Sequence, residues 1–542
     1  MEKKNSVKNS VIISGLIGTG GLFVAKLLGL VYSIPFSSIL GSEAYMGYYG
    51  QAYNIYSYVL NVFTAGFPFA VATLVARYTV LKDAKTVLLV KKISLSFLAV
   101  TGFIGMLILM ASAGFLAPLM VEEDPEIMAN VIRILSVAIF LVPVLSAFRG
   151  FYQGMKEMEE YAFSQAFEQL FRVGFLLSAA CLIVYVFGWE RKWALYASVL
   201  STSVAAIAAI AQIVHFDRTH CKPIIEQAAV QKEKPVDSKK LLKEFFVLAI
   251  PYLIVAILGY SDSIYNAVLL PTGLRLHNYT SDQITTIISA TTYVGVKLTA
   301  IPMILAPGFT AALIPHISSA LAQKNYKLAK KNVLDCLNII FYIALPVSFC
   351  IFAYAEPLFF TLFHNEDLQL CTYVTQWLSI EGFFGTLTPV VTNIMMALEL
   401  KRNVLKRLLV CTLIKGLTMV PLVWILGFPG AVISSTLGYL YLLYYNFKEI
   451  HKEYGINYHK TGIIIVRVCI GIVGLWITSL LLTQIGLGGV EGGKLISFVK
   501  MAANGLICVV VYFLITAYLK VPQSVFHIRF TGILNKLKRR GE

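Results

Sequence analysis

Several Lys and Arg side chains of this 542-residue chain fall inside long apolar segments, where a membrane-embedded charge costs a few kcal/mol or more. Lys26 lies near the middle of a segment that starts at Val11, and Lys297 lies well inside a later segment. Charged groups at such depth usually face a bundle interior or a water-filled cavity. The two cations therefore predict a cavity for an anionic substrate, although each could instead snorkel or pair with an acid such as Asp262 or Glu381.

The apolar segments at 50–76 and 285–319 contain residues that interrupt helices. We interpret five of them as helix breaks or hinges, because membranes tolerate broken helices only where protein or water satisfies the freed backbone groups. They are Gly66, Pro68, Pro302, Pro307 and Gly308.

Other intramembrane polar residues allow more than one interpretation. Glu168 and Arg172 lie four residues apart on one helix face and can pair, so a structural role is favoured over substrate contact. Asp262 could balance the charge of Lys297, or it could hold a coupling cation or proton. A tyrosine-rich stretch at 45–58 is interpreted as an aromatic belt at the membrane interface in preference to a sugar-facing wall.

The chain lacks the motifs of an enzyme. No H-E-x-x-H, G-x-S-x-G or Walker loop is present, and the eight cysteines are scattered without metal-ligand spacing. We expect no catalytic residue, no metal site and no cofactor. Transport would then be driven by the membrane potential or by the gradient of an ion that the sequence does not identify.

The composition indicates that most of the chain lies in a bilayer. Hydrophobic residues make up 58% and charged residues 14%, and the mean hydropathy is +0.74. Soluble chains carry roughly 25% charged residues. These values exclude a soluble enzyme, a nucleic-acid-binding protein and a disordered chain. We therefore attribute the net charge of +16 to membrane orientation and to anionic lipid headgroups in preference to nucleic-acid binding.

Fourteen apolar segments are long enough to form membrane-spanning helices, which need about 20 residues each. They cover roughly residues 11–35, 50–76, 93–117, 128–150, 161–187, 194–215, 245–270, 285–319, 332–361, 370–398, 407–426, 430–447, 461–484 and 497–519. Alternate loops, together with both ends of the chain, hold 35 Lys and Arg residues, whereas the opposite loops hold five. Because cytoplasmic loops carry this excess, we predict an all-α polytopic membrane protein with fourteen transmembrane helices and cytoplasmic termini.

A short internal repeat divides the segments into two sets. Gly66-Phe67 and Ala70 recur as Gly308-Phe309 and Ala312. We predict two parallel six-helix lobes with two added helices, as in transporters whose substrate site lies between repeats. The predicted domains are 1–216 (N-lobe), 217–244 (cytoplasmic linker), 245–447 (C-lobe), 461–519 (last two helices) and 520–542 (basic cytoplasmic tail).

Several short motifs resemble those of the multidrug/oligosaccharidyl-lipid/polysaccharide exporter superfamily. They are Ala25-Lys26-Leu27-Leu28-Gly29, Ala65-Gly66-Phe67-Pro68, Phe148-Arg149-Gly150-Phe151-Tyr152-Gln153-Gly154, and Glu168-Gln169 followed by Arg172. Their order over nearly the whole chain is similar to that of the MurJ-type lipid II flippases of Gram-positive bacteria and their stage V sporulation protein B relatives.

The resemblance implies two lobes around a cationic cavity that works by alternating access, with a groove for the undecaprenyl tail on the last two helices. It places Lys26 and Lys297 at basic positions that read the diphosphate of the cargo. It also places Asp262 at an acidic position of the seventh helix.

One position departs from this pattern. Relatives commonly carry a second basic residue in the first helix, where this chain has Ser33. Either the diphosphate contacts are redistributed, with Arg149 or Arg172 as candidates, or the cargo differs.

We predict a flippase, not an enzyme, that moves lipid II outward across a bacterial plasma membrane. Expected partners are lipid II, membrane lipids and cell-wall synthesis proteins, with no nucleic acid. Alternatives are export of another undecaprenyl-linked polysaccharide unit, cation-coupled drug efflux, or a non-transporting scaffold of a cell-wall or sporulation complex. The two helices beyond twelve disfavour a simple drug exporter, and a membrane glycosyl- or phosphotransferase lacks catalytic residues.

Overall fold

The computed structural model describes residues 28–29, 31–64, 66–121, 123–302, 317, 320–321, 323–488, 490 and 492–526. Within these ranges the regular structure is helical, without strands. Ten of the described helices are long and apolar enough to cross a membrane. The predicted spans that lie wholly in described residues coincide with helices, which confirms the all-α fold class.

The chain divides into two compact units, Met1–Tyr293 and Val294–Glu542. Helices of the first unit are α2 (Ser33–Leu40), α3 (Glu43–Thr64), α4 (Phe67–Val80), α5 (Ala84–Met120), α6 (Pro125–Gly154), α7 (Met158–Cys181), η1 (Leu182–Val186), α8 (Arg191–His220), α9 (Lys222–Val230), α10 (Ser238–Gly259), α11 (Ser261–Ile264), η2 (Tyr265–Leu269), α12 (Leu270–Leu276) and α13 (Ser281–Ser289). The π-helical turn η3 (Ala290–Gly295) contains the point of division.

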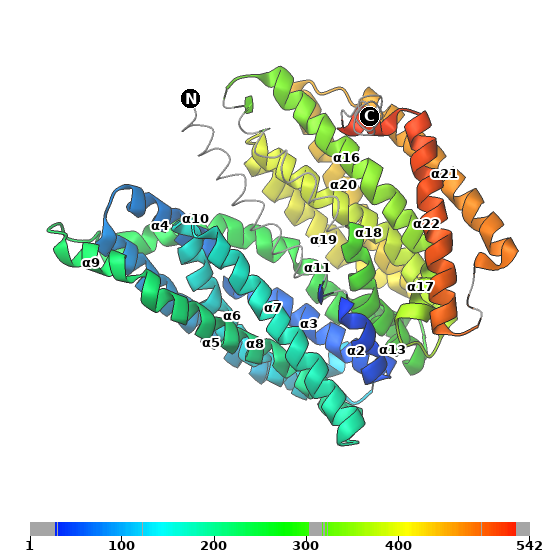
Figure 1. Ribbon diagram of the computed structural model, residues 1–542, viewed down its shortest axis with the longest axis horizontal. Coiled ribbons are helices and arrows are strands. Elements are labelled where there is room, and N and C mark those ends of the chain that lie inside the picture. The colour runs from blue at the N-terminus through cyan, green and yellow to red at the C-terminus, as the bar shows by residue number, and fades with distance from the viewer. Residues whose placement is uncertain are drawn as a thin grey trace, which may run out of the picture. The chain divides into compact units, whose positions relative to one another are not determined.

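The second unit is a bundle of long helices with short connections (Figure 1). Its helices are α16 (Tyr326–Ala353), α17 (Ala355–Leu362), α18 (Leu368–Ala397), α19 (Lys401–Leu426), α20 (Phe428–Tyr454), α21 (His459–Leu482), η4 (Thr483–Leu487), α22 (Lys494–Tyr518) and α23 (Val521–Phe526).

The division between units lies inside the eighth predicted span, not in the linker at 217–244 where the predicted lobes meet. The reason is that α10 packs on α3 and α4, and α13 packs on α3. Aromatic side chains fill the first of these contacts: the rings of Phe67 in α4 and Phe245 in α10 stack with centroids 5.5 Å apart. The lobe boundaries that the repeat suggests remain a prediction.

The second predicted span is interrupted where Gly and Pro occur in its sequence. Gly66 has φ +84°, a left-handed conformation that glycine adopts without strain, and α4 starts at the next residue with Pro68 in its first turn. This turn packs closely on α6, because a Cβ added at Gly150 would lie 2.7 Å from the carbonyl oxygen of Pro68. The break therefore lies against a neighbouring helix that leaves no spare room.

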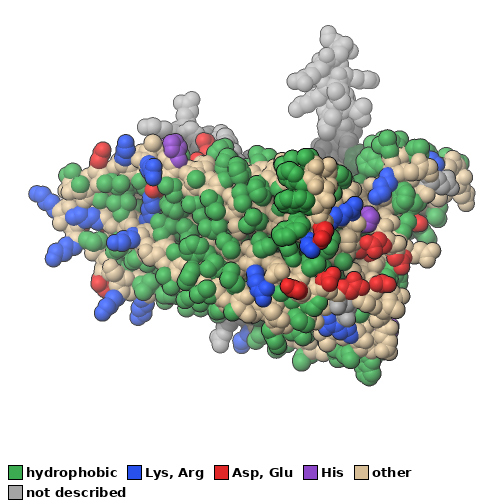
Figure 2. Space-filling model, turned by 90° about the horizontal axis from the view of Figure 1, so that it is seen from below, with side chains coloured by type: hydrophobic (Ala, Val, Ile, Leu, Met, Phe, Trp, Pro, Cys, Tyr) green, Lys and Arg blue, Asp and Glu red, His purple; other side chains and the backbone are tan. Residues whose placement is uncertain are grey.

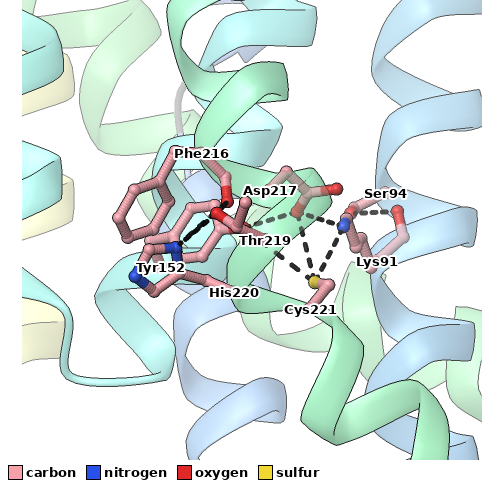
Figure 3. A network of polar contacts seen from close by, with 8 residues as sticks. All are labelled: Lys91, Ser94, Tyr152, Phe216, Asp217, Thr219, His220 and Cys221. Atoms are coloured by element: carbon pink, nitrogen blue, oxygen red, sulfur yellow. Dashed lines mark hydrogen bonds and ion pairs between the residues drawn. The ribbon is translucent and has the colours of Figure 1, made fainter.

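The linker begins with a polar network that joins three long helices (Figure 3). Asp217, near the end of α8, pairs with Lys91 of α5 and accepts a hydrogen bond from the hydroxyl of Tyr152 of α6, at 2.5 Å. The thiol of Cys221 donates to the same carboxylate at 3.2 Å. Gln231, just beyond α9, donates to Asp83 at 2.9 Å. The linker therefore contacts α5 and α6 before α9, and it contacts the N-cap of α5 after α9.

Apolar side chains cover much of the face drawn in Figure 2, as expected for a surface that contacts lipid. Lys and Arg gather at its left end, which is the end of the first unit where α9 lies in Figure 1. The helix α9 thus lies where Lys and Arg side chains gather, and the linker that contains it is one of the Lys/Arg-rich loops of the predicted topology.

Candidate functional site

The predicted cavity residues lie only partly in the described chain. Lys26, Pro307 and Gly308 are outside the described residues. Lys297 is partly buried on the first α-helical turn after η3, and Pro302 is buried at the end of the same described stretch. The eighth span therefore carries its cation next to a π-helical turn, which is a frequent feature of functional sites.

Ser33, the position where relatives carry a second basic residue, is fully enclosed. It starts α2 and has no exposed surface. Its carbonyl oxygen accepts a hydrogen bond from the hydroxyl of Tyr293, at 2.9 Å. Tyr293 is itself 1% exposed. A long basic side chain would have no room at this position in the described packing.

Asp262 lies in a discontinuous part of the seventh span. Its helix, α11, is a four-residue segment between the end of α10 at Gly259 and the π-helical turn η2. The side chain is partly buried. Because Asp262 belongs to the first unit and Lys297 to the second, the predicted charge balance between them remains a prediction.

Arg149 and Glu168 form an ion pair between α6 and α7. Their charged atoms lie 2.8 Å apart, and their side chains are 11% and 18% exposed. Arg149 also donates to the backbone carbonyl and the hydroxyl of Ser164, at 2.8 and 3.2 Å. The sequence suggests that Glu168 pairs with Arg172 on the same helix, whereas the structure gives its ion pair to Arg149 of the neighbouring helix.

Arg172 occupies a different polar environment on α7. Its guanidinium donates to the side-chain oxygen of Gln169, at 2.5 Å. It lies close enough to the hydroxyls of Tyr53, Tyr32 and Tyr49 to interact electrostatically with them. Gln169, which is 7% exposed, is a polar residue of this cluster to which sequence reasoning assigned no role. Its spacing of three residues from Arg172 is the signal that could have indicated it.

The tyrosines of α3 point into the first unit. Tyr49 is 3% exposed, and its hydroxyl lies 3.1 Å from that of Tyr32. Tyr53 shares a hydrogen bond with Thr202 of α8. Tyr48 and Tyr56 are also buried. An aromatic belt faces the membrane interface, so the belt interpretation is wrong for the buried Tyr48, Tyr49 and Tyr56. Tyr49 instead contacts the residue before α2, Tyr53 contacts α8, and Tyr48 donates to the carbonyl oxygen of Glu123.

A second pair of intramembrane charges lies within the other unit. Lys415 of α19 and Glu381 of α18 lie 3.5 Å apart, and the Lys415 side chain is 3% exposed. The sequence allows Glu381 as a partner of Lys26 or Lys297, whereas the structure pairs it with Lys415. They are therefore not available as free cavity charges.

The described residues contain no group of three or more His, Cys, Asp or Glu side chains that could hold a metal ion. The polar groups gathered around Arg172 are guanidinium, carboxamide and phenol groups. These groups bind anions and hydroxyls, and none of them is arranged as a nucleophile with a base.

An apolar cavity of about 470 Å³ lies in the second unit, between α16, α17, α21 and α22. Aliphatic and aromatic side chains line it, among them Ile343, Val347, Leu475, Val509 and Tyr512. Gly505 of α22 also faces it, and the space beside this glycine is open. A cavity with this lining suits a hydrocarbon chain.

Comparison of the sequence with known proteins gives a consistent set of relatives. Residues 11–321 match the family described as Polysaccharide biosynthesis protein. The chain is 29% identical over 454 residues to Lipid II flippase MurJ of Bacillus subtilis (strain 168), covering 81% of this chain and 82% of that protein. It is 22% identical over 342 residues to Stage V sporulation protein B of the same organism, covering 62% and 63%.

Solved structures with a similar fold are transporters. A structure of Lipid II flippase MurJ in an inward closed conformation matches with a TM-score of 0.64 and 13% identity, covering 93% of this chain and 99% of that chain. An inward-facing multidrug resistance MATE family transporter matches with a TM-score of 0.60 and 16% identity, covering 80% and 94%. At these identities, the similarity concerns the fold.

Proposed function

The chain belongs to the polysaccharide biosynthesis protein family, and from this premise we propose that it is a lipid II flippase. It moves the undecaprenyl-diphosphate-linked precursor from the inner to the outer leaflet of a bacterial plasma membrane by alternating access. It is a transporter and not an enzyme. The similarity to the Bacillus subtilis flippase over 81% of the chain supports this cargo.

The observation that carries the proposal is the apolar cavity of the second unit. Two of its four walls are α21 and α22, the helices beyond the predicted twelve. A drug exporter has no long hydrocarbon tail to accommodate, whereas a prenyl-linked cargo has one. The cavity holds part of the undecaprenyl tail while the head group crosses.

The diphosphate is bound by cations inside the cavity between the lobes. Lys26 and Lys297 make the principal contacts, and Asp262 sets their charge balance. Because Ser33 is enclosed and carries no charge, Arg149 or Arg172 takes part in place of the second cation of the first helix. Charge-assisted hydrogen bonds to phosphate oxygens are about twice as strong as neutral ones, which suits a site that must extract a diphosphate from water.

Movement of the head group is driven by the membrane potential or an ion gradient, with both termini in the cytoplasm. Lipid II and membrane lipids are its partners, and cell-wall synthesis proteins take up the product outside. A cargo that carries charge across the membrane is coupled to the potential at about 2.3 kcal/mol per charge per 100 mV.

The test is the exposure of lipid II at the outer surface of cells depleted of this protein, measured with a membrane-impermeant probe. Wild type, Lys26→Ala and Lys297→Ala are then restored separately in a strain without another flippase. We expect depletion to lower external lipid II and only the wild type to restore it. Full activity of both single variants would contradict the assignment of the cationic site.

A second assay separates lipid II from related cargoes. External lipid II that stays unchanged on depletion excludes lipid II as the cargo, and the same probe strategy is then applied to other undecaprenyl-linked glycans. A scaffold would tolerate both cavity substitutions and lose function on changes in its loops or in residues 520–542.

A further inference from the structure

Two buried hydrogen-bond donors of the first unit point at no acceptor in the described part of the chain. They are the Nε–H of Arg172 and the Nε2–H of Gln169. Gln169 is more than nine-tenths buried, and its oxygen already accepts from the Arg172 guanidinium. A buried donor without an acceptor costs about 1–3 kcal/mol. Native proteins retain such groups rarely, and each one calls for an explanation such as a functional role, a water molecule or a bound ion.

The charges around these donors are also unequal. Glu168 lies 2.8 Å from Arg149 and neutralises it. Among the described residues, no carboxylate lies within ion-pair distance of Arg172, although Glu168 interacts with it electrostatically at longer range, as do the hydroxyls of Tyr53, Tyr32 and Tyr49. The Arg149–Glu168–Arg172 group therefore carries one excess positive charge in a setting where a lone charge is costly.

The donor pair lies beside the first span, which carries the predicted cation Lys26. A Cβ added at Gly29 would lie 3.9 Å from Nε2 of Gln169. Gly29 follows Lys26 by three residues in the sequence. The buried Gln169, to which the partly buried Arg172 donates, is thus next to the helix that the proposed function assigns to diphosphate binding.

We infer that Arg172 and Gln169 form an oxyanion site for the cargo, a step that rests on the proposed function. An oxygen of a phosphate or carboxylate group accepts from Nε of Arg172 and from Nε2 of Gln169, while the Gln169 oxygen holds the guanidinium in place. The site supplies the charge that the enclosed Ser33 does not. Both donor atoms are buried. An anion can therefore reach them only after the side chains that enclose them move apart.

This assignment separates the two arginines that the sequence left as alternatives. Arg149 is already held by Glu168 and Ser164, which occupy its Nε and Nη2 donors. Arg172 retains an Nε–H without an acceptor, and it makes no direct ion pair with a described carboxylate. Arg149 is a positioning residue for α7, and Arg172 is the residue that touches the cargo.

One substitution distinguishes an effect on binding from an effect on stability. Gln169→Glu preserves the acceptor for Arg172, removes the donor, and places a resident carboxylate where the cargo oxygen would lie. We expect it to weaken binding of the anion about tenfold or more, without lowering the melting temperature. A purely structural role of Gln169 would leave binding unchanged or lower both together.

The test uses the full-length protein in nanodiscs and native mass spectrometry, with three probes. Undecaprenyl diphosphate supplies only phosphate, the soluble disaccharide-pentapeptide supplies only carboxylates, and undecaprenol is uncharged. Wild type, Gln169→Glu and Arg172→Gln are compared. Arg133→Gln, at an exposed arginine of α6 that donates to Asn130, is the matched control.

Loss of undecaprenyl diphosphate in both variants identifies phosphate as the bound group, and loss of the disaccharide-pentapeptide identifies a carboxylate. Either result supports the site, provided that undecaprenol and the Arg133→Gln control are unaffected. If both variants bind every probe as the wild type does, the oxyanion site is wrong while the proposed function stands. If the wild type binds no prenyl diphosphate at all, both proposals are wrong.

Discussion

The carboxylate of Glu168 in α7 lies 2.8 Å from the guanidinium of Arg149 in α6. Both side chains are largely withdrawn from solvent, and Ser164 accepts the remaining arginine N–H groups. The pair joins two helices of the first unit at a depth where an unmatched charge is expensive. The attraction between the two charges contributes little net stability. Loss of one partner would be costly because it leaves the other charge buried without a counter-charge.

Removal of one partner is therefore expected to be worse than removal of both. Glu168→Gln should lower the free energy of unfolding by about 3 kcal/mol, because it leaves Arg149 charged and buried. The double variant Arg149→Gln/Glu168→Gln should recover much of this loss. Thermal unfolding in detergent, arranged as a double-mutant cycle, measures the coupling. Equal destabilisation by the single and double variants would contradict a paired role.

The partners of intramembrane charges show what the sequence could and could not predict. The helices follow from apolar runs of membrane-spanning length, and the break before α4 follows from Gly66 and Pro68. The partner of Glu168 depends on how α6 and α7 are rotated about their axes, which hydropathy does not specify. The partner of Glu381 likewise depends on how α18 and α19 are rotated, and in the structure it is Lys415.

Neutral polar residues and backbone irregularities were harder still to predict. Gln169 carries no charge, and burial of a neutral amide costs less free energy than burial of a charge. Its presence in an apolar segment therefore does not indicate a site. The π-helical turns η2 and η3 have no sequence signature of their own, yet they interrupt the seventh and eighth spans. These features are set by packing between helices and are visible only once the helices are placed.

The contact of α3 with the eighth span depends on one glycine. A Cβ at Gly50 would lie 2.4 Å from Oγ1 of Thr292 and 2.7 Å from its backbone carbon. Gly50→Ala should therefore force the helices apart and cost about 1–3 kcal/mol. We expect a lower melting temperature and reduced lipid II exposure in the cell assay.

Gly47, one turn earlier in the same helix, is the matched control. Its added Cβ would meet Ile288 at 3.5 Å, an ordinary contact. Gly47→Ala should be neutral or slightly stabilising, since alanine favours the helix by about 1 kcal/mol over glycine. Equal effects of the two substitutions would mean that the close approach at Thr292 is unimportant.

The docking of the linker should depend on pH through Asp83, which caps α5. Burial raises the pKa of this carboxyl, but hydrogen bonds from the Thr86 side chain, Gln231 and the Thr86 backbone outweigh burial and hold the pKa below its usual value. A lowered folded-state pKa stabilises the docked linker at pH above the unfolded value of about 4 and loses this contribution as pH falls through the folded value.

Limited proteolysis of the linker as a function of pH measures this effect. Cleavage after α9 should increase as the pH falls below about 4 in the wild type. Asp83→Ala should be more readily cleaved already at pH 7, because the loss of a helix N-cap costs about 1 kcal/mol. A pH profile that is identical in wild type and variant would show that Asp83 does not fasten the linker.

The apolar cavity of the second unit can be filled without disturbing its walls. Nothing lies within 4 Å of a Cβ placed at Gly505, which faces the cavity from α22. A leucine at this position would occupy space that the proposed prenyl tail needs, so the tail would be excluded by overlap of atoms. Gly505→Leu should therefore leave the melting temperature unchanged or raise it, while external lipid II falls sharply.

Gly462 of α21 provides the same substitution outside the cavity. It too has nothing within 4 Å of an added Cβ, it is exposed, and it does not line the cavity. Gly462→Leu should retain full transport, because the new side chain meets only lipid. If Gly505→Leu supports external lipid II as well as Gly462→Leu does, the cavity does not hold the tail. A loss confined to Gly505→Leu, in a protein of undiminished stability, would place the prenyl chain between α16 and α22.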